Sequence, residues 1–254
     1  MIPDPLPGKL PKIAAAFWIM KISATTLGET AGDLLSMTIH VGYAVSSLIL
    51  LSAFLVSLIA QLLAPRYLPP LYWLVILATS TAGTTISDYM DRTLGFGYAT
   101  GSAILIALLV GTLVFWRISM GSLSVDHVRS RKAELLYWIA ILFSNTLGTA
   151  LGDYLSDSSG LGFAGGALLI GGILALILAA TYLTRISRIA LFWLAFILTR
   201  PFGATIGDVL TKAPEQGGVG LGTIGSSAIL AAILVVFVAI ETRRGQRIEV
   251  RAVG

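Results

Sequence analysis

Four glycine–aspartate elements divide the chain into copies of one pattern. In each copy a glycine stands five residues before an aspartate inside an apolar stretch, and the copies end at Asp33, Asp88, Asp153 and Asp208. Successive aspartates are 55, 65 and 55 residues apart, so the first pair maps onto the second with an offset of 120 residues. This spacing indicates that one copy was duplicated and that the resulting pair was then duplicated again. Self-similarity at a fixed period predicts a fold built from repeated units.

A second element follows each aspartate. The sequences GYAVSS, GYATGS, GFAGGA and GTIGSS begin at Gly42, Gly97, Gly162 and Gly222. The distance from aspartate to glycine is nine residues in the first three copies and 14 in the fourth, so five extra residues lie in the last turn, around residues 213–217. Two aligned elements in every copy support four repeats, over residues 12–66, 69–120, 133–187 and 188–243.

Composition places the chain in a membrane. Of its 254 residues 56% are hydrophobic and 12% are charged, whereas soluble domains carry about 25% charged residues. A helix that crosses a bilayer needs about 20 apolar residues, and each repeat supplies two such stretches. We therefore predict an all-α integral membrane protein, a single domain over residues 1–254. Its eight transmembrane helices are expected at 13–36, 43–63, 71–91, 98–117, 134–156, 163–183, 189–211 and 221–240.

Basic residues predict the orientation of these helices. One set of connections, with both termini, holds Lys9, Lys12, Arg66, Arg117, Arg129, Arg131, Lys132, Arg185, Arg188, Arg243, Arg244, Arg247 and Arg251. The opposite set holds only Arg92 and Lys212. Because basic loops stay on the cytoplasmic side, both termini are expected there. This topology signal accounts for most of the net charge of +4, so we expect no nucleic-acid partner, and a lipid-headgroup contact for the basic tail.

The repeats are expected to be parallel. Each contains an even number of spans, so all four enter from the same side as parallel helical hairpins, unlike the inverted repeats of many transporters. Asp33 lies 21 residues after Lys12, about 31 Å along a helix at 1.5 Å per residue. We therefore place the aspartates near the extracytoplasmic ends of the odd-numbered helices.

A polar stripe leads inward from each aspartate. Residues four apart share a helix face, and positions four and eight before the aspartates hold Glu29 and Thr25, Thr84 and Ser80, Thr149 and Asn145, and Ala204 and Arg200. Lys21 extends the first stripe by one turn. If the odd helices line the centre, the stripes converge on a lumen with five acids and two bases, Lys21 and Arg200. An excess of three negative charges there would attract cations or protons.

The glycines and acidic residues of the repeats can also be explained by structural roles. Glycines four residues apart, such as Gly28 and Gly32, allow close helix packing in lipid. An aspartate near an interface can cap a neighbouring turn, and Glu29 can form an internal ion pair with Arg200 or Lys21. Four aligned aspartates and a further buried glutamate favour a function, because intramembrane acids are rare and costly.

Enzymatic chemistry finds little support. The chain has no cysteine, which removes disulfides and thiolate ligands. No histidine lies inside a predicted span, so a serine nucleophile would lack its base. An aspartyl protease resembling the presenilin type carries glycine three residues before its catalytic aspartate, where this chain has Thr30, Thr85, Ala150 and Thr205. We therefore expect no enzyme and no cofactor.

Four tandem G-x-[TA]-x-[GS]-D elements, each followed by G-[YFT]-[AI], resemble a bacterial group of multi-spanning proteins described as membrane-anchored proteins carrying a repeat of unknown function. The resemblance covers nearly the whole chain. It implies an all-helical repeat protein in the bacterial inner membrane, and it carries no settled substrate. The fourth copy departs most, with Arg200 and Pro201 where the others have small polar residues.

The residue types favour a transporter for a hard cation of the Mg²⁺ or Mn²⁺ class, since carboxylates and hydroxyls suit such ions. Asp33, Asp88 and Asp153 are the expected metal ligands, with Asp208 in the same ring. Glu29 is expected to gate or to carry a coupled proton, and Lys21 and Arg200 to act in coupling or as charge partners. Neutral oxygens would come from Thr25, Thr84, Thr149, Ser80 and Asn145.

Two alternatives remain open at this stage. In a proton-coupled transporter of a small organic solute, Lys21 and Arg200 would bind a carboxylate while the acids carry protons. In a structural or sensory membrane protein the stripes would only hold the bundle together. The expected partners are the lipid bilayer and a small cation or proton. A homodimer formed through glycine-rich even helices, such as residues 165–172, is the alternative to their internal packing.

Overall fold

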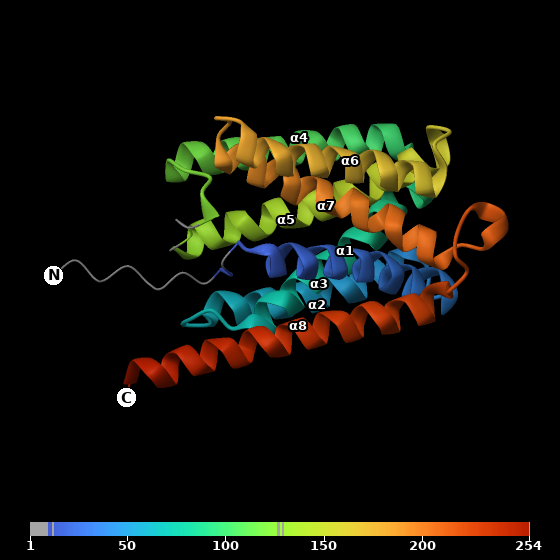
Figure 1. Cartoon of the computed structure of the whole chain (residues 1–254). Coiled ribbons are helices and arrows are strands. Elements are labelled where there is room, and N and C mark those ends of the chain that lie inside the picture. The colour runs from blue at the N-terminus through green and yellow to red at the C-terminus, as the bar shows by residue number, and fades with distance from the viewer. Residues whose placement is uncertain (1–9, 12, 126–127, 129, 254) are drawn as a thin grey trace.

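The computed structural model describes residues 10–253 except 12, 126–127 and 129, with side chains up to residue 244. Lys9, Lys12 and Arg129 of the predicted cytoplasmic set lie outside the described residues, as do the side chains of Arg247 and Arg251. The described chain is helical and contains no strand. Its long helices are α1 (Ala15–Asp33), α2 (Tyr43–Leu63), α3 (Pro69–Asp88), α4 (Gly97–Met120), α5 (Arg131–Asp153), α6 (Gly162–Leu183), α7 (Arg188–Thr211) and α8 (Gly222–Val253). The helices lie side by side, and α1 begins at the end of the bundle where α8 finishes (Figure 1).

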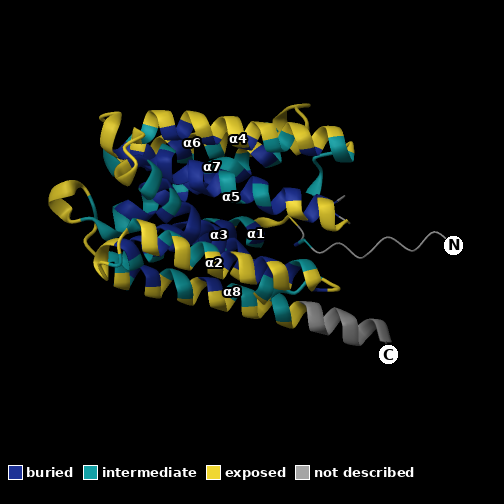
Figure 2. Ribbon diagram, turned by 180° about the vertical axis from the view of Figure 1, so that it is seen from behind, coloured by how far each residue is buried: buried dark blue, intermediate teal, exposed yellow. Residues whose placement is uncertain are grey.

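The odd-numbered helices form an inner ring. Each of α1, α3, α5 and α7 packs against two others, in the closed order α1–α3–α5–α7. The even helices cover this ring from outside, α2 on α3, α4 on α5, α6 on α7 and α8 on α1. Figure 2 shows the result as a buried centre with exposed outer ridges. The even helix of each copy therefore packs mainly on the odd helix of the next copy, and α8 closes the circle on α1.

Six of the eight helices are long and apolar enough to cross a membrane, namely α2, α4, α5, α6, α7 and α8. The other two, α1 and α3, lie in the inner ring and carry many buried hydroxyl and charged side chains. The outer helices expose large apolar side chains, including Ile118, Leu168 and Val56 at about 70–80% of their surface. Apolar ridges outside and buried polar side chains inside are consistent with a multi-pass membrane protein, in which ionisable residues face the interior of the bundle.

The glycine of each glycine–aspartate element lets two inner helices approach closely. A Cβ atom added at Gly28 would lie 2.1 Å from Ser80 Oγ of α3. The same contact recurs around the ring, at 2.9 Å from Thr146 N for Gly83, 2.1 Å from Arg200 Cγ for Gly148 and 2.5 Å from Thr25 Oγ1 for Gly203. The packing role predicted for these glycines is confirmed.

A change of helix type follows the first three aspartates. Their helices continue as π-helical turns, η1 (Leu34–Thr38), η2 (Tyr89–Thr93) and η4 (Tyr154–Ser158). In the fourth copy α7 runs on to Thr211, and the inserted residues form a 3₁₀ turn, η5 (Pro214–Gln216). The glycine of the second element has φ between 67° and 81° in all four copies. Only glycine adopts this left-handed conformation without strain, which explains its recurrence.

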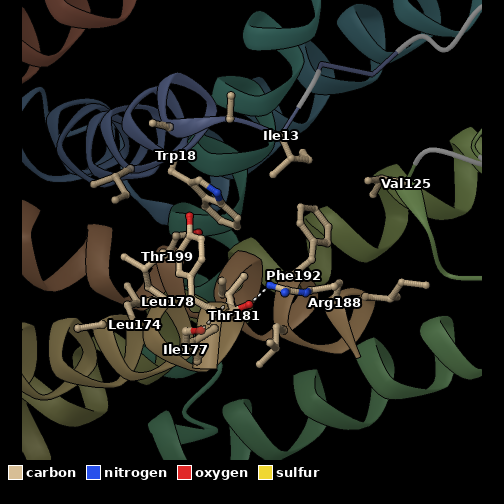
Figure 3. A pocket seen from close by; sticks show the side chains of 18 of the residues that line it. Ile13, Trp18, Val125, Leu174, Ile177, Leu178, Thr181, Arg188, Phe192 and Thr199 are labelled. Carbon is tan, nitrogen blue, oxygen red and sulfur yellow. Dashed lines mark hydrogen bonds between the residues drawn. The ribbon is translucent and has the colours of Figure 1, made fainter. Parts of the chain in front are cut away.

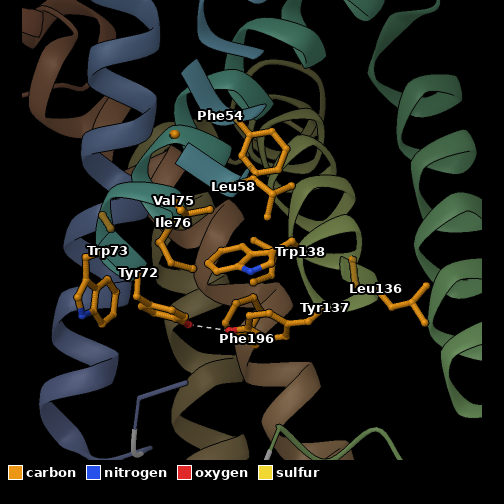
Figure 4. Close-up of a cluster of buried hydrophobic side chains, with 14 of the residues drawn as sticks. Phe54, Leu58, Tyr72, Trp73, Val75, Ile76, Leu136, Tyr137, Trp138 and Phe196 are labelled. Atoms are coloured by element: carbon orange, nitrogen blue, oxygen red, sulfur yellow. Dashed lines mark hydrogen bonds between the residues drawn. The ribbon is translucent and has the colours of Figure 1, made fainter. Parts of the chain in front are cut away.

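Aromatic side chains fill the inner ring at the opposite end from the aspartates. The hydroxyl oxygens of Tyr72 and Tyr137 are 2.6 Å apart, and both rings are buried with Trp138 and Phe196 (Figure 4). Their ring centroids lie 5.2–6.4 Å apart in edge-on or tilted pairs, a spacing at which aromatic rings attract one another. This end of the ring is therefore a packed apolar plug.

Candidate functional site: a buried polar column

Side chains of the four stripes stack in layers along the inner ring, and we call these layers the polar column. The first layer contains Lys21, Ile76, Ile141 and Phe196, the second Thr25, Ser80, Asn145 and Arg200, the third Glu29, Thr84, Thr149 and Ala204, and the last the four aspartates. Every one of these side chains is buried, with Asp33 the most exposed at 6%. From Lys21 to Asp33 the column is about 18 Å long at 1.5 Å per residue.

An ion pair occupies the middle of the column. Arg200 Nη1 lies 2.9 Å from Glu29 Oε2, and Arg200 Nη2 donates to Thr84 Oγ1 at 2.5 Å and to Thr149 Oγ1 at 2.7 Å. The hydroxyls of Thr84 and Thr149 each lie 3.2 Å from the same Glu29 oxygen. Each inner helix thus supplies one member of a single cluster. The pairing of Glu29 with Arg200, one of two considered from the sequence, is present.

Backbone carbonyl groups complete the surroundings of Arg200. Its guanidinium also donates to the carbonyl oxygens of Ser80 at 3.3 Å and Thr25 at 3.5 Å. Its Nε atom is buried and has no partner among the described residues. Arg200 is fully buried, so its charge is compensated by Glu29 and by these oxygens rather than by water.

Lys21 lies one layer nearer the aromatic plug. Its Nζ atom is 3.5 Å from Asn145 Oδ1 and 4.1 Å from the centre of the Phe196 ring. Asn145 in turn donates to Thr79 Oγ1 at 2.8 Å. No carboxylate of the described residues lies within ion-pair distance of Lys21. Burying a charged amine without an acidic partner costs free energy. The ammonium group of Lys21 therefore has N–H donors that could bind a further acceptor.

The aspartate layer is held by cations that sequence reasoning missed. Arg92 bridges two of the acids, with Nε 3.0 Å from Asp88 Oδ1 and Nη2 3.0 Å from Asp153 Oδ2. Lys212 Nζ lies 3.4 Å from Asp208 Oδ1. Lys212 follows the last residue of α7. Burial disfavours its charged form, but the carboxylates of Asp208, Asp33 and Asp153 together outweigh this and raise the pKa of Lys212.

Asp33 differs from the other three aspartates. The position four residues beyond it is Met37, where the second and fourth copies have Arg92 and Lys212. Within the part of the chain that the structure describes, no ion pair or hydrogen bond reaches its carboxylate. It still lies in the electrostatic range of Glu29, Lys212 and Arg92. Asp33 is therefore the acid of the column that is open to a ligand or a proton.

The predicted excess of three negative charges needs correction. Arg92 and Lys212 were assigned to the outer connections as topology markers, but both fold back over the aspartates. Five acids therefore face four bases. Buried carboxylates are stabilised only when they are paired, and the spacing of four residues on one helix face was the signal that could have revealed these partners.

A preformed metal centre is not present among the described residues, where no three His, Cys, Asp or Glu side chains are grouped to hold an ion. Arg92 occupies the space between Asp88 and Asp153, two of the three predicted metal ligands. The hydroxyls of Thr84 and Thr149, predicted as neutral ligands, face Arg200 and Glu29. Ser80 and Thr25 direct carbonyl oxygens to the same guanidinium.

One family model matches the chain four times, over residues 16–67, 71–122, 136–187 and 191–247. The chain belongs to the DUF347 family. That model is described as a repeat of unknown function, so the resemblance seen in the glycine–aspartate elements is confirmed and brings no substrate with it. No curated protein and no solved structure matches the chain. Each DUF347 copy contributes one inner helix, one outer helix and one aspartate to the column.

Proposed function

We propose that this DUF347 protein is a proton-coupled membrane transporter whose pathway is the polar column, with a small organic anion as its substrate. In this proposal all eight helices cross a bacterial inner membrane and both termini are cytoplasmic. The polar residues that α1 and α3 contribute to the column are buried inside the ring, so in this proposal they do not face lipid. The single observation that carries the proposal is the column itself, because buried charges within a membrane mark the paths of ions, protons and substrates.

The charge balance of the column supports proton coupling. Five acids and four bases leave one formal negative charge, and an uncompensated buried charge costs several kcal/mol. One proton on a carboxyl group neutralises the column. Asp33 is the acid without a basic partner among the described residues, and Glu29 lies one helical turn below it. Protonation and release at these two carboxyls would change the charge that a substrate meets.

The central ion pair supports an anionic substrate. With Arg200 bound to Glu29, Thr84 and Thr149, the column is closed at its middle. A proton on Glu29 would weaken its hold on Arg200, and the freed guanidinium could then bind a carboxylate in two parallel hydrogen bonds. Lys21, which lacks an acidic partner in the described chain, is the second cation available to that carboxylate. Proton uptake and anion binding would thus be linked through one pair.

A hard cation of the Mg²⁺ or Mn²⁺ class is the second candidate substrate. It is favoured by the unpaired carboxylate of Asp33 in a layer of four aspartates. Binding a divalent ion there would require Arg92 or Lys212 to leave the layer, because their charges repel it. The anion needs no such exchange in the aspartate layer, and we therefore place it first.

The test is proton movement in proteoliposomes that contain a trapped pH-sensitive dye. Small carboxylic acids, Mg²⁺ and Mn²⁺ are added outside in turn. We expect a carboxylic acid to drive proton entry, Asp33→Asn to abolish it, and Asp157→Asn to retain it. Asp157 is the matched control, an exposed acid outside the column that accepts a bond from the Tyr98 hydroxyl at 3.2 Å.

Three outcomes decide between the candidates. Proton movement driven by Mn²⁺ or Mg²⁺ and by no acid would replace the anion with the cation. Proton movement that survives in Asp33→Asn would remove Asp33 from the coupling. If no solute moves protons although the protein is folded in the vesicles, the polar column is structural and the transport proposal is wrong.

A further inference from the structure

A large apolar cleft lies outside the polar column, between α1, α6 and α7 (Figure 3). Its volume is about 700 Å³, within the range of small-molecule sites. Trp18 and Ile22 line it from α1, Leu178 from α6, Phe192 from α7, and residues 123–125 close one side. Apolar side chains dominate this lining, so the cleft suits a hydrocarbon chain better than a polar solute.

The cleft arises from uneven cover around the inner ring. Besides its main partner α1, α8 also packs on α3 and on α7, and α2 also packs on α5. In contrast, α6 packs on α7 and makes no comparable contact with α1. In Figure 1, α6 and α8 lie on opposite sides of the bundle. The cleft lies between α1 and α7 where neither α8 nor a contact between α6 and α1 closes it, and none of the described residues of α8 is in its lining.

A positive charge is fixed at the mouth of the cleft. The guanidinium of Arg188, at the start of α7, donates from Nη1 to the carbonyl oxygen of Thr181 on α6, which holds it at the cleft wall (Figure 3). Arg188 is exposed, as is Arg185 in the same connection. A guanidinium has five N–H donors, so Arg188 keeps donors for a second partner. None of the described residues that line the cleft is acidic.

We propose that this cleft is a binding site for one anionic phospholipid of the surrounding membrane. An acyl chain fills the apolar cleft between Trp18, Leu178 and Phe192, and the phosphate binds the free donors of Arg188. Basic pockets between membrane helices bind anionic headgroups on the cytoplasmic side, and indole rings favour the depth of the headgroups. A free anion would contact only the guanidinium of Arg188, whereas a neutral lipid would contact only the apolar lining of the cleft.

The cleft reaches the wall of the polar column at its inner end. Thr199 lines the cleft, and its carbonyl oxygen accepts a bond from Thr25 Oγ1 at 3.2 Å. Arg200 is the next residue along α7. A bound acyl chain would therefore press on the backbone that positions the central ion pair. The lipid site itself rests on the cleft and on Arg188, and it does not depend on the proposed transport.

The experiment is native mass spectrometry of the full-length protein released from detergent, with phosphatidylglycerol and phosphatidylcholine of equal chain length offered together. We expect the wild type to retain one phosphatidylglycerol in preference to phosphatidylcholine. Arg188→Gln should lower retention of phosphatidylglycerol about fivefold, the effect of one basic residue near an anionic headgroup. Arg117→Gln is the matched control, since it removes an exposed arginine from α4 that does not line the cleft, and it should change nothing.

Filling the cleft tests the acyl chain separately. Ala195→Trp places an indole in the lining and should abolish retention of both lipids. If that variant does not fold, Leu178→Trp at an exposed position on α6 serves the same purpose. Equal retention of the two lipids by the wild type, or unchanged retention of phosphatidylglycerol in Arg188→Gln, would overturn the proposal. Full displacement of the lipid by glycerol phosphate would also overturn it, because the headgroup alone would then account for binding.

Discussion

The central ion pair allows a quantitative prediction. Arg200→Met would remove the buried cation and leave Glu29 charged in the middle of the inner ring. Three side-chain hydrogen bonds from Arg200 would be lost, and at about 0.6 kcal/mol each in membrane proteins they account for roughly 2 kcal/mol. The uncompensated charge of Glu29 adds to this. We expect a total loss of about 3–5 kcal/mol of unfolding free energy, the usual cost of breaking a buried pair.

Removing both charges should cost less than removing one. In the double variant Glu29→Gln, Arg200→Met no buried charge is left unpaired, so the unfolding free energy should recover by about 2–3 kcal/mol relative to the sum of the single variants. Lys21→Met is the control. It also removes a fully buried cation, but one without an acidic partner in the described chain, and it should cause little loss.

The measurement is equilibrium unfolding by sodium dodecyl sulfate in mixed micelles, followed by the fluorescence of the five tryptophans. Strictly additive effects of Glu29→Gln and Arg200→Met would show that the two side chains do not stabilise each other. A loss in Lys21→Met as large as that in Arg200→Met would show that burial of any cation, and not this pair, supports the ring.

Two further predictions use the same unfolding measurement. Gly28→Ala should lower the unfolding free energy by about 1–3 kcal/mol through overpacking, because its Cβ would meet Ser80. Gly111→Ala on α4, which has open space around it, should instead raise the unfolding free energy by about 0.5–1 kcal/mol through helix propensity. Equal effects of the two variants would contradict the close approach of α1 and α3. Arg92→Gln should destabilise more than Lys212→Gln because Arg92 holds two aspartates and Lys212 holds one. High salt should reduce both effects, since the side chains of Arg92 and Lys212 are 33% and 27% exposed and salt screens exposed charges. A larger effect of Lys212→Gln would refute the bridging role.

The layers of the column could be predicted because each inner helix packs on the next through equivalent positions. Glu29, Thr84 and Thr149 stand at equal distances from their aspartates, so equal sequence offset becomes equal height in the bundle. The spacing of four residues marks Arg92 and Lys212 as possible partners of Asp88 and Asp208, but it does not establish that the side chains meet. Whether Arg92 turns back over Asp88 or outward to water depends on a choice among side-chain conformations, which a helical stripe does not specify.

The partners of the outer helices could not be predicted either. Both faces of an even helix are apolar, as lipid and a protein neighbour are equally apolar surroundings for leucine. The pattern therefore does not say which inner helix α2 or α6 will cover. The cleft beside α1 follows from this choice of neighbours, and so it too lies beyond the reach of the sequence pattern.

The closing contact between α8 and α1 has a consequence for the order of synthesis. α1 leaves the ribosome first, with Lys21 and Glu29 on it, yet the helix that covers it is made last. Glu29 has no Arg200 until α7 is made, and α1 has no helix to cover it until α8 follows. The partners of the first copy therefore come from the fourth, and α1 reaches its final surroundings only after α7 and α8 have been made.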